Sequence, residues 1–352
     1  MRPGRMIRGR TKRGPAIALG TLAAANGIAW LWAAIAFAHT PALLGSALLA
    51  WLLGLRHAAD ADHLAAIDNV VRKLMQDGQR PHLVGLFFSL GHASVVLLAC
   101  VLIAATASSA LVDPLRAVID PLRVLGGVIG TVVSAGFLMA IAAVNLALLL
   151  RLARGGDSDA DQDRLMSGRG LLARILRPAA RMVRRPAHMF PLGFLFGLGF
   201  DTATEIGLLA LSAAQAASGL SIAQVLVFPA LFTAGMALID TADSAMMVGA
   251  YGWALSDPRR KRTYNLGVTG LSVLLAVAIG GIEAAGLLSD QFGLRGLGWT
   301  LADTANGHLG QAGFVIIALF LLAWGVSAWR YRRAPAVAYT RHHLPTGPSG
   351  GQ

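Results

Sequence analysis

The sequence is short of charge and almost free of cysteine. Only 14% of its 352 residues are Asp, Glu, Lys or Arg, while 55% are hydrophobic and the mean hydropathy is +0.61. Soluble domains carry about 25% charged residues, so this composition excludes both a cytosolic globular protein and a disordered chain. The single cysteine, Cys100, excludes an internal disulfide scaffold, and its apolar neighbours favour a packing role.

Lysine is also scarce, and two catalytic motifs are absent. Lys12, Lys73 and Lys261 are the only lysines, and none follows the Gly-x-x-x-x-Gly pattern that ATP hydrolysis would need. The sequence also lacks His-Glu-x-x-His, which argues against a membrane metallo-hydrolase. The chain is therefore not expected to be an enzyme or to carry a resident cofactor.

Long apolar segments take the place of the missing charge. A helix that crosses a membrane needs about 20 mainly apolar residues, and the sequence predicts eight such segments. They cover residues 17–38, 42–71, 83–105, 122–150, 188–217, 222–250, 265–288 and 312–329. The expected fold is an all-α polytopic membrane protein with eight transmembrane helices.

The basic residues predict the orientation of these helices. With the N-terminus inside, 26 of the 30 Lys and Arg residues lie on the cytoplasmic side and three on the other, while Arg56 lies within the second segment. This asymmetry follows the positive-inside rule and places both termini in the cytoplasm. The net charge of +12 then reports orientation in the cytoplasmic (inner) membrane, and nucleic acid is not an expected partner.

The same assignment predicts how the chain is organised. A basic cytoplasmic N-terminus precedes the first four helices, a polar cytoplasmic loop separates them from the last four, and a cytoplasmic tail ends the chain. These five regions are residues 1–16, 17–150, 151–187, 188–330 and 331–352.

Eight carboxylates nevertheless lie within the apolar segments. A charge at the centre of a membrane helix costs about 2.5–3.5 kcal/mol, so these groups should face the bundle interior and be neutralised by protons, Arg56 or a bound cation. They are Asp60, Asp62, Asp68, Asp201, Glu205, Asp240, Asp243 and Glu283, and the same segments hold His57, His63 and His92. Imidazole and carboxylate without thiolate suit Ni, Co, Zn, Mn or Fe(II) rather than Cu(I). The expected partners are a divalent transition-metal ion and the lipid bilayer.

Spacing limits which side chains of the second segment can share one ion. At about 100° per residue, His57 and Asp60 lie on one face of a regular helix, whereas Asp62 points about 140° away from His57. Either the helix is broken here, or Asp62 pairs with Arg56 or with a neighbouring helix. We expect an ion site formed by His57, Asp60 and His63 and supported by acids of the fifth and sixth segments.

Hydroxyl side chains near these residues have two interpretations. They either hold the ligand side chains in place or form hydrogen bonds between helices. The residues concerned are Ser89, Thr202, Thr204 and Thr241.

Four motifs in order resemble those of the nickel/cobalt transporter family, and most nearly its high-affinity nickel permeases. They are Leu-Arg-His-Ala-x-Asp-Ala-Asp-His ending at His63, Phe-Ser-Leu-Gly-His ending at His92, Leu-Gly-Phe-Asp-Thr-Ala-Thr-Glu ending at Glu205, and Gly-Met-Ala-Leu-Ile-Asp-Thr-x-Asp ending at Asp243. Together with eight segments and an extended inner loop, the resemblance covers most of the chain, and the core motifs show no departure.

The resemblance implies secondary transport of Ni2+, with Co2+ as a second candidate, into the cytoplasm. It implies that His57, Asp62 and His63 are essential. It also places further residues along the ion path: His92, Asp201, Glu205, Asp240 and Asp243.

Import and export of the same metals both fit these motifs. Exporters among the relatives tend to carry a His-rich loop, and the inner loop 151–187 contains no His, which favours import. An ATPase subunit is not required, because a divalent cation that crosses about 100 mV gains about 4.6 kcal/mol. Proton coupling through the carboxylates is a second possible driving force. A pure receptor or scaffold would not need eight acids inside the membrane.

Overall fold

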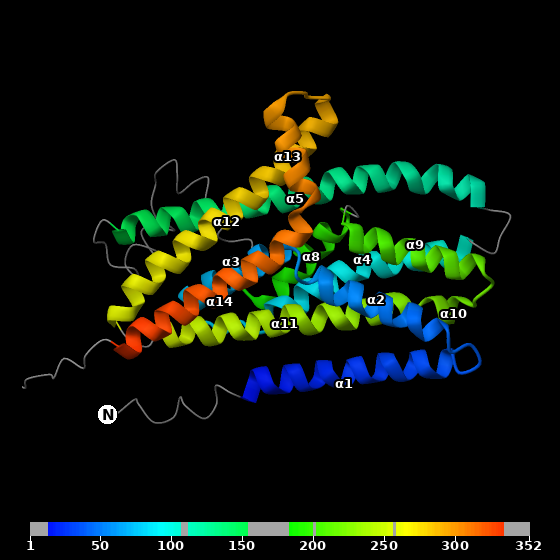
Figure 1. Ribbon diagram of the computed structural model, residues 1–352, viewed down its shortest axis with the longest axis horizontal. Helices are drawn as coiled ribbons and strands as arrows, with labels where there is room; N and C mark the ends of the chain where they lie inside the picture. Colours follow the sequence, from blue (N-terminus) through cyan, green and yellow to red (C-terminus); the bar gives the residue numbers. More distant parts are fainter. Residues whose placement is uncertain (1–12, 107–111, 154–182, 200–201, 256–257, 334–352) are drawn as a thin grey trace, which may run out of the picture.

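The computed structural model describes residues 13–106, 112–153, 183–199, 202–255 and 258–333 (Figure 1). Within these ranges the chain forms helices and no strands, which confirms the all-α class. Most of the predicted N-terminal segment, inner loop and tail lies outside the described residues, as does Asp201.

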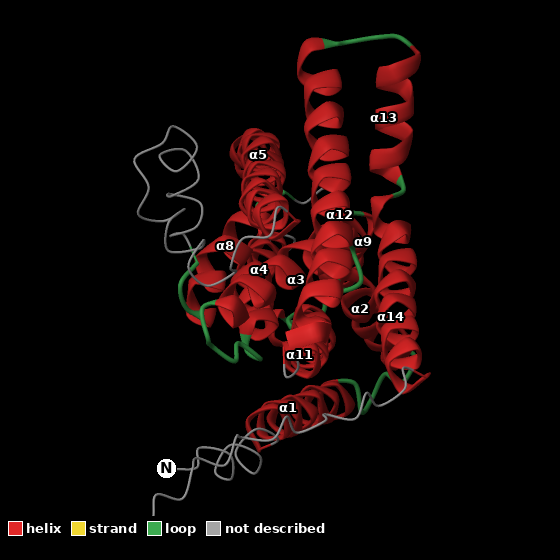
Figure 2. Ribbon diagram, turned by 90° about the vertical axis from the view of Figure 1, so that its left-hand side faces the viewer, coloured by secondary structure: helices red, strands yellow, loops and turns green. Residues whose placement is uncertain are grey.

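The helices form a bundle, and their bounds are as follows. They are α1 (Arg13–Ala36), α2 (Leu43–His57), α3 (Ala61–Gln76), α4 (Val84–Thr106), α5 (Val112–Ala153), the 3-10 helix η1 (Pro186–His188), α8 (Met189–Gly197), α9 (Ala203–Ala217), α10 (Ile222–Val225), α11 (Val227–Leu255), α12 (Pro258–Phe292), α13 (Leu297–Gly307) and α14 (Leu309–Arg333). The sequence did not predict α13; it stands beyond the rest of the bundle with the end of α12 (Figure 2).

Fewer candidate spans are found than the eight that the sequence predicts. In the described residues, α1, α4, α5, the α10–α11 segment and α12 are long and apolar enough to cross a membrane. The pair α13 and α14, bent by 71°, gives a sixth if it is taken as one span. The other two missing spans are the second and fifth predicted segments, each of which divides into two shorter helices, α2/α3 and α8/α9.

The sequence left open whether the helix at residues 42–71 is broken near Asp62, and the structure shows that it is. Helix α2 ends in a tight turn in which the Asp60 N–H donates to the His57 carbonyl at 2.9 Å. Asp60 itself is extended (φ −67°, ψ 147°), and α3 begins at the next residue. Helix α14 packs directly on this turn, because a Cβ built on Gly313 would lie only 1.5 Å from the Ala59 carbonyl oxygen.

The second break separates α8 from α9. Helix α9 starts after Thr202, which is extended and whose hydroxyl accepts a hydrogen bond from the Glu205 N–H at 3.4 Å. Such a polar N-cap satisfies one of the free N–H groups of a helix start. In Figure 1, α2 runs from right to left and α9 from left to right, so the two broken pairs have opposite directions.

Each broken pair packs closely against one long helix. Helix α2 meets α11 where a Cβ on Gly54 would lie 2.1 Å from the Phe232 carbonyl oxygen. Helix α8 meets α4 in the same way, because a Cβ on Gly193 would lie 2.1 Å from the Phe88 carbonyl oxygen. Only glycine allows backbones to approach this closely. The same order of helices thus occurs twice along the chain: a broken pair is followed by two long helices. The first set is α2/α3, α4 and α5, and the second is α8/α9, α11 and α12. The last helices of the two sets, α5 and α12, pack along each other.

The second predicted segment ends at residue 71 and so leaves Arg72 and Lys73 in the connection that follows it, whereas in the structure the helix continues through both residues. Both lie on α3, and both are buried, with Arg72 only 3% exposed. The physical reason is that α3 continues as far as Gln76, and the Arg72 guanidinium meets the Asp68 carboxylate one turn earlier at 3.2 Å.

The contact between α14 and the first break predicts a specific loss of stability. Gly313→Ala would place a methyl group against the Ala59 carbonyl, and overpacking of this kind costs about 1–3 kcal/mol. Gly325→Ala is the matched control, because it lies on the same helix with open space around it. Thermal unfolding in detergent should show a lower midpoint for Gly313→Ala alone, and equal midpoints for the two variants would contradict the packing described.

Candidate metal centre

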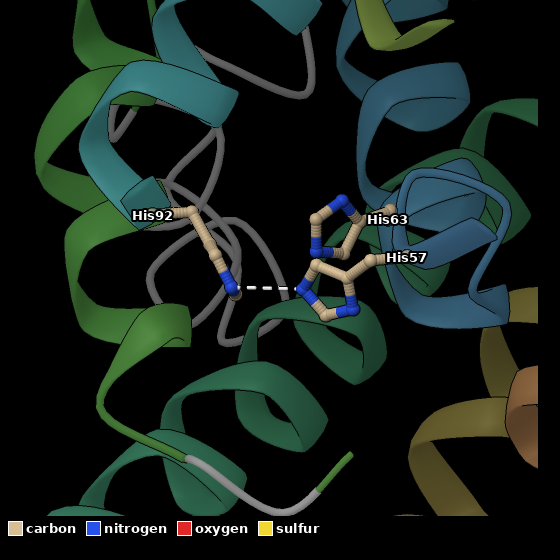
Figure 3. A group of neighbouring side chains, drawn as sticks. All are labelled: His57, His63 and His92. Atoms are coloured by element: carbon tan, nitrogen blue, oxygen red, sulfur yellow. Dashed lines mark hydrogen bonds between the residues drawn. The ribbon is translucent and has the colours of Figure 1, made fainter. Parts of the chain in front are cut away.

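Three histidines meet in the middle of the bundle (Figure 3). His57 is the last residue of α2, His63 lies in the first turn of α3, and His92 comes from α4. One ring nitrogen of each lies within 4.8 Å of the other two, and all three side chains are buried. The three imidazoles therefore lie close enough together to hold a single metal ion.

The spacing of two of these nitrogens matches that of ligands on a metal. His57 Nε2 and His92 Nε2 are 2.9 Å apart. Two imidazoles bound at right angles, with metal–nitrogen bonds of about 2.1 Å, would place their nitrogens about 3.0 Å apart. Neither ring nitrogen of His63 has a hydrogen-bond partner among the described residues, although the side chain is fully buried. The Asp240 carboxylate lies 3.4 Å from Nδ1 of this ring, so Nε2 is the nitrogen that is available to an ion.

The break between α2 and α3 is what brings His57 and His63 together. In a continuous helix, residues six apart would be separated by about 9 Å along the axis and by about 240° around it. After the turn, the two ring centroids are only 4.6 Å apart.

Asp60 and Thr204 fix the orientation of the His57 ring. His57 Nδ1 lies 2.8 Å from Asp60 Oδ2 and 3.0 Å from the Thr204 hydroxyl. A carboxylate on Nδ1 is the usual arrangement that leaves Nε2 of a histidine available to a metal. Arg56, on the other side of Asp60, lies 3.5 Å from its second oxygen. In this structure Asp60 contacts the His57 ring and can hold it in position, and its role as a direct metal ligand stays a prediction.

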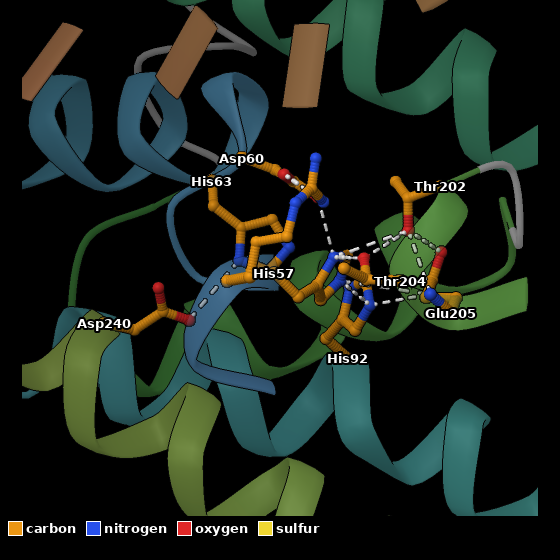
Figure 4. A network of polar contacts seen from close by, with 9 residues as sticks. His57, Asp60, His63, His92, Thr202, Thr204, Glu205 and Asp240 are labelled. Carbon is orange, nitrogen blue, oxygen red and sulfur yellow. Dashed lines mark hydrogen bonds and ion pairs between the residues drawn. The ribbon is translucent and has the colours of Figure 1, made fainter. Parts of the chain in front are cut away.

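Glu205 approaches the cluster from the first turn of α9 (Figure 4). Its Oε1 lies 2.8 Å from His92 Nε2 and 4.0 Å from His57 Nε2. The Thr202 hydroxyl donates to the other carboxylate oxygen at 3.0 Å and so holds the side chain in place. Glu205 can add an oxygen ligand next to two of the three imidazoles.

Asp240 approaches the cluster from α11, on the side of His63. Its Oδ2 lies 3.4 Å from His63 Nδ1 and accepts a hydrogen bond from the Ser89 hydroxyl at 2.5 Å. Its Oδ1 is buried and has no hydrogen-bond partner among the described residues. Glu205 and Asp240 together carry two negative charges, which a divalent cation between them would balance.

In the part of the chain that the structure describes, no hydrogen bond or ion pair joins Asp62 or Asp243 to the three imidazoles. Asp62 is half-buried in the first turn of α3 and takes no part in the hydrogen bonds described above, although its charge acts on His63. Asp243 is buried one turn beyond Asp240 on α11. Asp201 lies outside the described residues.

Three of the four hydroxyl side chains fulfil the roles that the sequence left open, whereas the buried Thr241 hydroxyl has no hydrogen-bond partner among the described residues. Ser89, Thr202 and Thr204 hold site residues, and Ser89 and Thr204 do so between helices. The sequence analysis missed the contribution of α14, where a Cβ on Gly310 would lie 3.0 Å from Asp60 Oδ1. The one signal for it was the pair Gly310 and Gly313, which are three residues apart and therefore neighbours on one face of a helix.

Because Asp60 contacts the His57 ring, we expect its replacement to weaken metal binding while the three histidines remain as ligands. Asp60→Asn should weaken binding of Co2+ to the purified protein about 10–100-fold, the range for groups that orient a metal-bound histidine. Titration calorimetry measures this change. Asp290→Asn, the same substitution at an exposed position of α12, is the control. Equal affinities of the two variants would show that His57 does not depend on Asp60.

Comparison with known proteins identifies the family. A family model described as "High-affinity nickel-transport protein" matches residues 43–330. The chain is 54% identical to the hydrogenase nickel incorporation protein HupN of Bradyrhizobium diazoefficiens, over 91% of this chain and 84% of the relative. It is 46% identical to the nickel transporter NicT of Mycobacterium tuberculosis, over 82% and 80% of the two chains.

A further relative is named for another metal. The cobalt transport protein NhlF of Rhodococcus rhodochrous is 40% identical over 80% of this chain and 81% of the relative. No solved structure matches the chain. The resemblance that the four sequence motifs indicated is confirmed, and the chain belongs to the family of high-affinity nickel-transport proteins.

Proposed function

We propose that this chain is a secondary transporter that imports Ni2+ across the cytoplasmic membrane, with Co2+ as a second substrate. The observation that carries the proposal is the buried group of His57, His63 and His92, with Glu205 and Asp240 beside it. Three imidazoles and two carboxylates suit a divalent ion of intermediate softness. The metal is cargo in this proposal, and no resident cofactor takes part.

Eight crossings of the membrane are part of the proposal. Five long helices, α14 and the two broken pairs α2/α3 and α8/α9 together supply them. In many secondary transporters, discontinuous helices meet near the middle of the membrane and form the ion site there. The position of the three histidines at the first break supports the same arrangement here. The strong bias of basic residues supports cytoplasmic termini.

The membrane potential supplies enough energy for import without an ATPase subunit. A divalent cation that crosses about 100 mV gains about 4.6 kcal/mol, which corresponds to an accumulation of about 2000-fold. Protons carried by the intramembrane carboxylates are a second contribution to the driving force. In this proposal Asp62, Asp201 and Asp243 guide the ion towards the histidines or away from them.

An exporter would differ from the proposed importer only in the direction in which it moves the metal. The geometry of the site is the same for both directions, because a buried ion must be released to one side or the other. The absence of His from residues 151–187 supports import.

Accumulation of radioactive nickel in cells that express the protein tests this proposal. We expect cells with the wild-type protein to accumulate more nickel than empty-vector cells. We expect His57→Ala to return uptake to the empty-vector level, because it removes a ligand of the site. His39→Ala is the matched control, because His39 is exposed between α1 and α2. Excess Co2+ should reduce nickel uptake by the wild-type protein.

Two results would overturn the proposal in different ways. If cells with the wild-type protein hold less nickel than empty-vector cells, the protein exports the metal. If His57→Ala and His39→Ala both keep wild-type uptake, the histidine cluster is not the transport site.

A further inference from the structure

A second buried polar cluster lies farther along α3, and Arg72 is at its centre. The Arg72 guanidinium lies 3.2 Å from Asp68 Oδ2 and donates to the Thr269 hydroxyl at 2.7 Å. It also donates to the hydroxyls of Tyr251 and Ser272, and the Tyr251 hydroxyl in turn donates to Asp68. The guanidinium carbon lies 4.7 Å from the centroid of the Tyr251 ring. All five side chains are buried.

This Arg72 cluster joins the two sets of helices that repeat along the chain. Asp68 and Arg72 lie on α3 of the first set, whereas Tyr251 lies on α11 and Thr269 and Ser272 on α12 of the second. The ion pair is formed within α3, and each contact of the cluster between the two sets involves a neutral hydroxyl. Helix α3 can therefore move away from α11 and α12 without separating the two charges, which would be costly in a buried place.

The cluster lies on the cytoplasmic side of the histidine site in the proposed orientation. Helices α3 and α11 pack together and run in the same direction in Figure 1. His63 faces Asp240, and farther along the same two helices Arg72 contacts Tyr251. At 1.5 Å per residue, the second contact is about 13 Å farther along α3 and about 16 Å farther along α11. Both helices then lead to connections that the distribution of basic residues places in the cytoplasm.

Side chains between these two contacts are buried as well. Ile67 and Val70 on α3 and Ser244 on α11 are each 0% exposed. The packing of α3 against α11 thus leaves no open route between the two contacts. Release of an ion along this side requires the two helices to separate.

Tyr251 has space beside it into which its ring can turn. A cavity of about 200 Å³ lies between α11, α12 and α14, and Tyr251 forms part of its wall. The other residues of the wall include Met247 of α11, Val268 of α12 and Phe320 of α14. The Tyr251 hydroxyl can therefore leave the ion pair without a rearrangement of the whole bundle.

We propose that the Arg72 cluster is a latch that holds the cytoplasmic side of the transporter closed. It opens when Tyr251, Thr269 and Ser272 leave Arg72, which stays paired with Asp68. The inference rests on the proposed function and names the contacts that break when the ion is released inwards. Because these hydrogen bonds exist only in the closed conformation, their removal shifts the equilibrium towards the conformation that is open to the cytoplasm.

Reaction of a thiol placed between the two contacts tests the latch. Cys100→Ser combined with Ser244→Cys leaves one reporter thiol at a buried position of α11. Inside-out membrane vesicles expose the cytoplasmic side to a membrane-impermeant maleimide. Tyr251→Phe and Thr269→Val should each raise the labelling rate about tenfold, the order expected for a lost hydrogen bond to a charged group. Both substitutions leave Asp68 and Arg72 in place.

Two controls separate opening of the latch from general loosening of the bundle. Thr304→Val makes the same chemical change as Thr269→Val at an exposed position of α13 and should leave the labelling rate unchanged. In right-side-out vesicles, neither latch variant should be labelled faster than the protein that carries the reporter thiol alone. Unchanged labelling in both latch variants, or an equal increase from the two sides of the membrane, would overturn the latch.

The proposed function is tested separately in the same cells. Wild-type cells that fail to accumulate nickel would overturn import by this protein. Wild-type cells that accumulate nickel, together with unchanged labelling of the latch variants, would overturn the latch alone.

Discussion

The turn at residues 58–60 is the constraint on which the rest of the site depends. It stops α2 at His57, starts α3 after Asp60, and so lays the His63 ring against the His57 ring at a centroid distance of 4.6 Å. The turn is held from outside, because the Ala59 carbonyl lies against Gly313 of α14. A membrane helix would otherwise continue through this sequence, since its backbone groups are best satisfied within the helix.

The second broken pair repeats the same construction in the other half of the chain. Asp60 precedes α3 and Thr202 precedes α9, and both residues are extended. In each helix the third residue, His63 or Glu205, reaches the site. The long helices α4 and α11, which pack closely against α8 and α2, provide the two remaining contacts. The site is therefore built from both halves, and a movement of one half against the other would change the contacts of Glu205 and Asp240 with the three histidines, which all belong to the first half.

Sequence reasoning found the all-α class and most residues of the site, because charges inside apolar segments are costly and therefore conspicuous. It could not locate the break, because Ala58-Ala59-Asp60 contains neither proline nor glycine and the turn depends on a helix about 250 residues away. It ended the second segment at residue 71, just before Arg72, for a related reason. Hydropathy counts the charge of Arg72 but not the hydroxyls of α11 and α12 that surround it. Residue order alone also could not distinguish Asp60, which orients a histidine, from a direct ligand.

The central claim is that one divalent ion is held by the imidazoles of His57, His63 and His92. X-ray absorption at the nickel edge, on the purified protein with one equivalent of Ni2+, tests it most directly. Scattering from three imidazole rings is expected, with metal–nitrogen distances of about 2.1 Å. His92→Ala should reduce the number of rings to two. A spectrum of oxygen ligands only, or one that His92→Ala leaves unchanged, would contradict the claim.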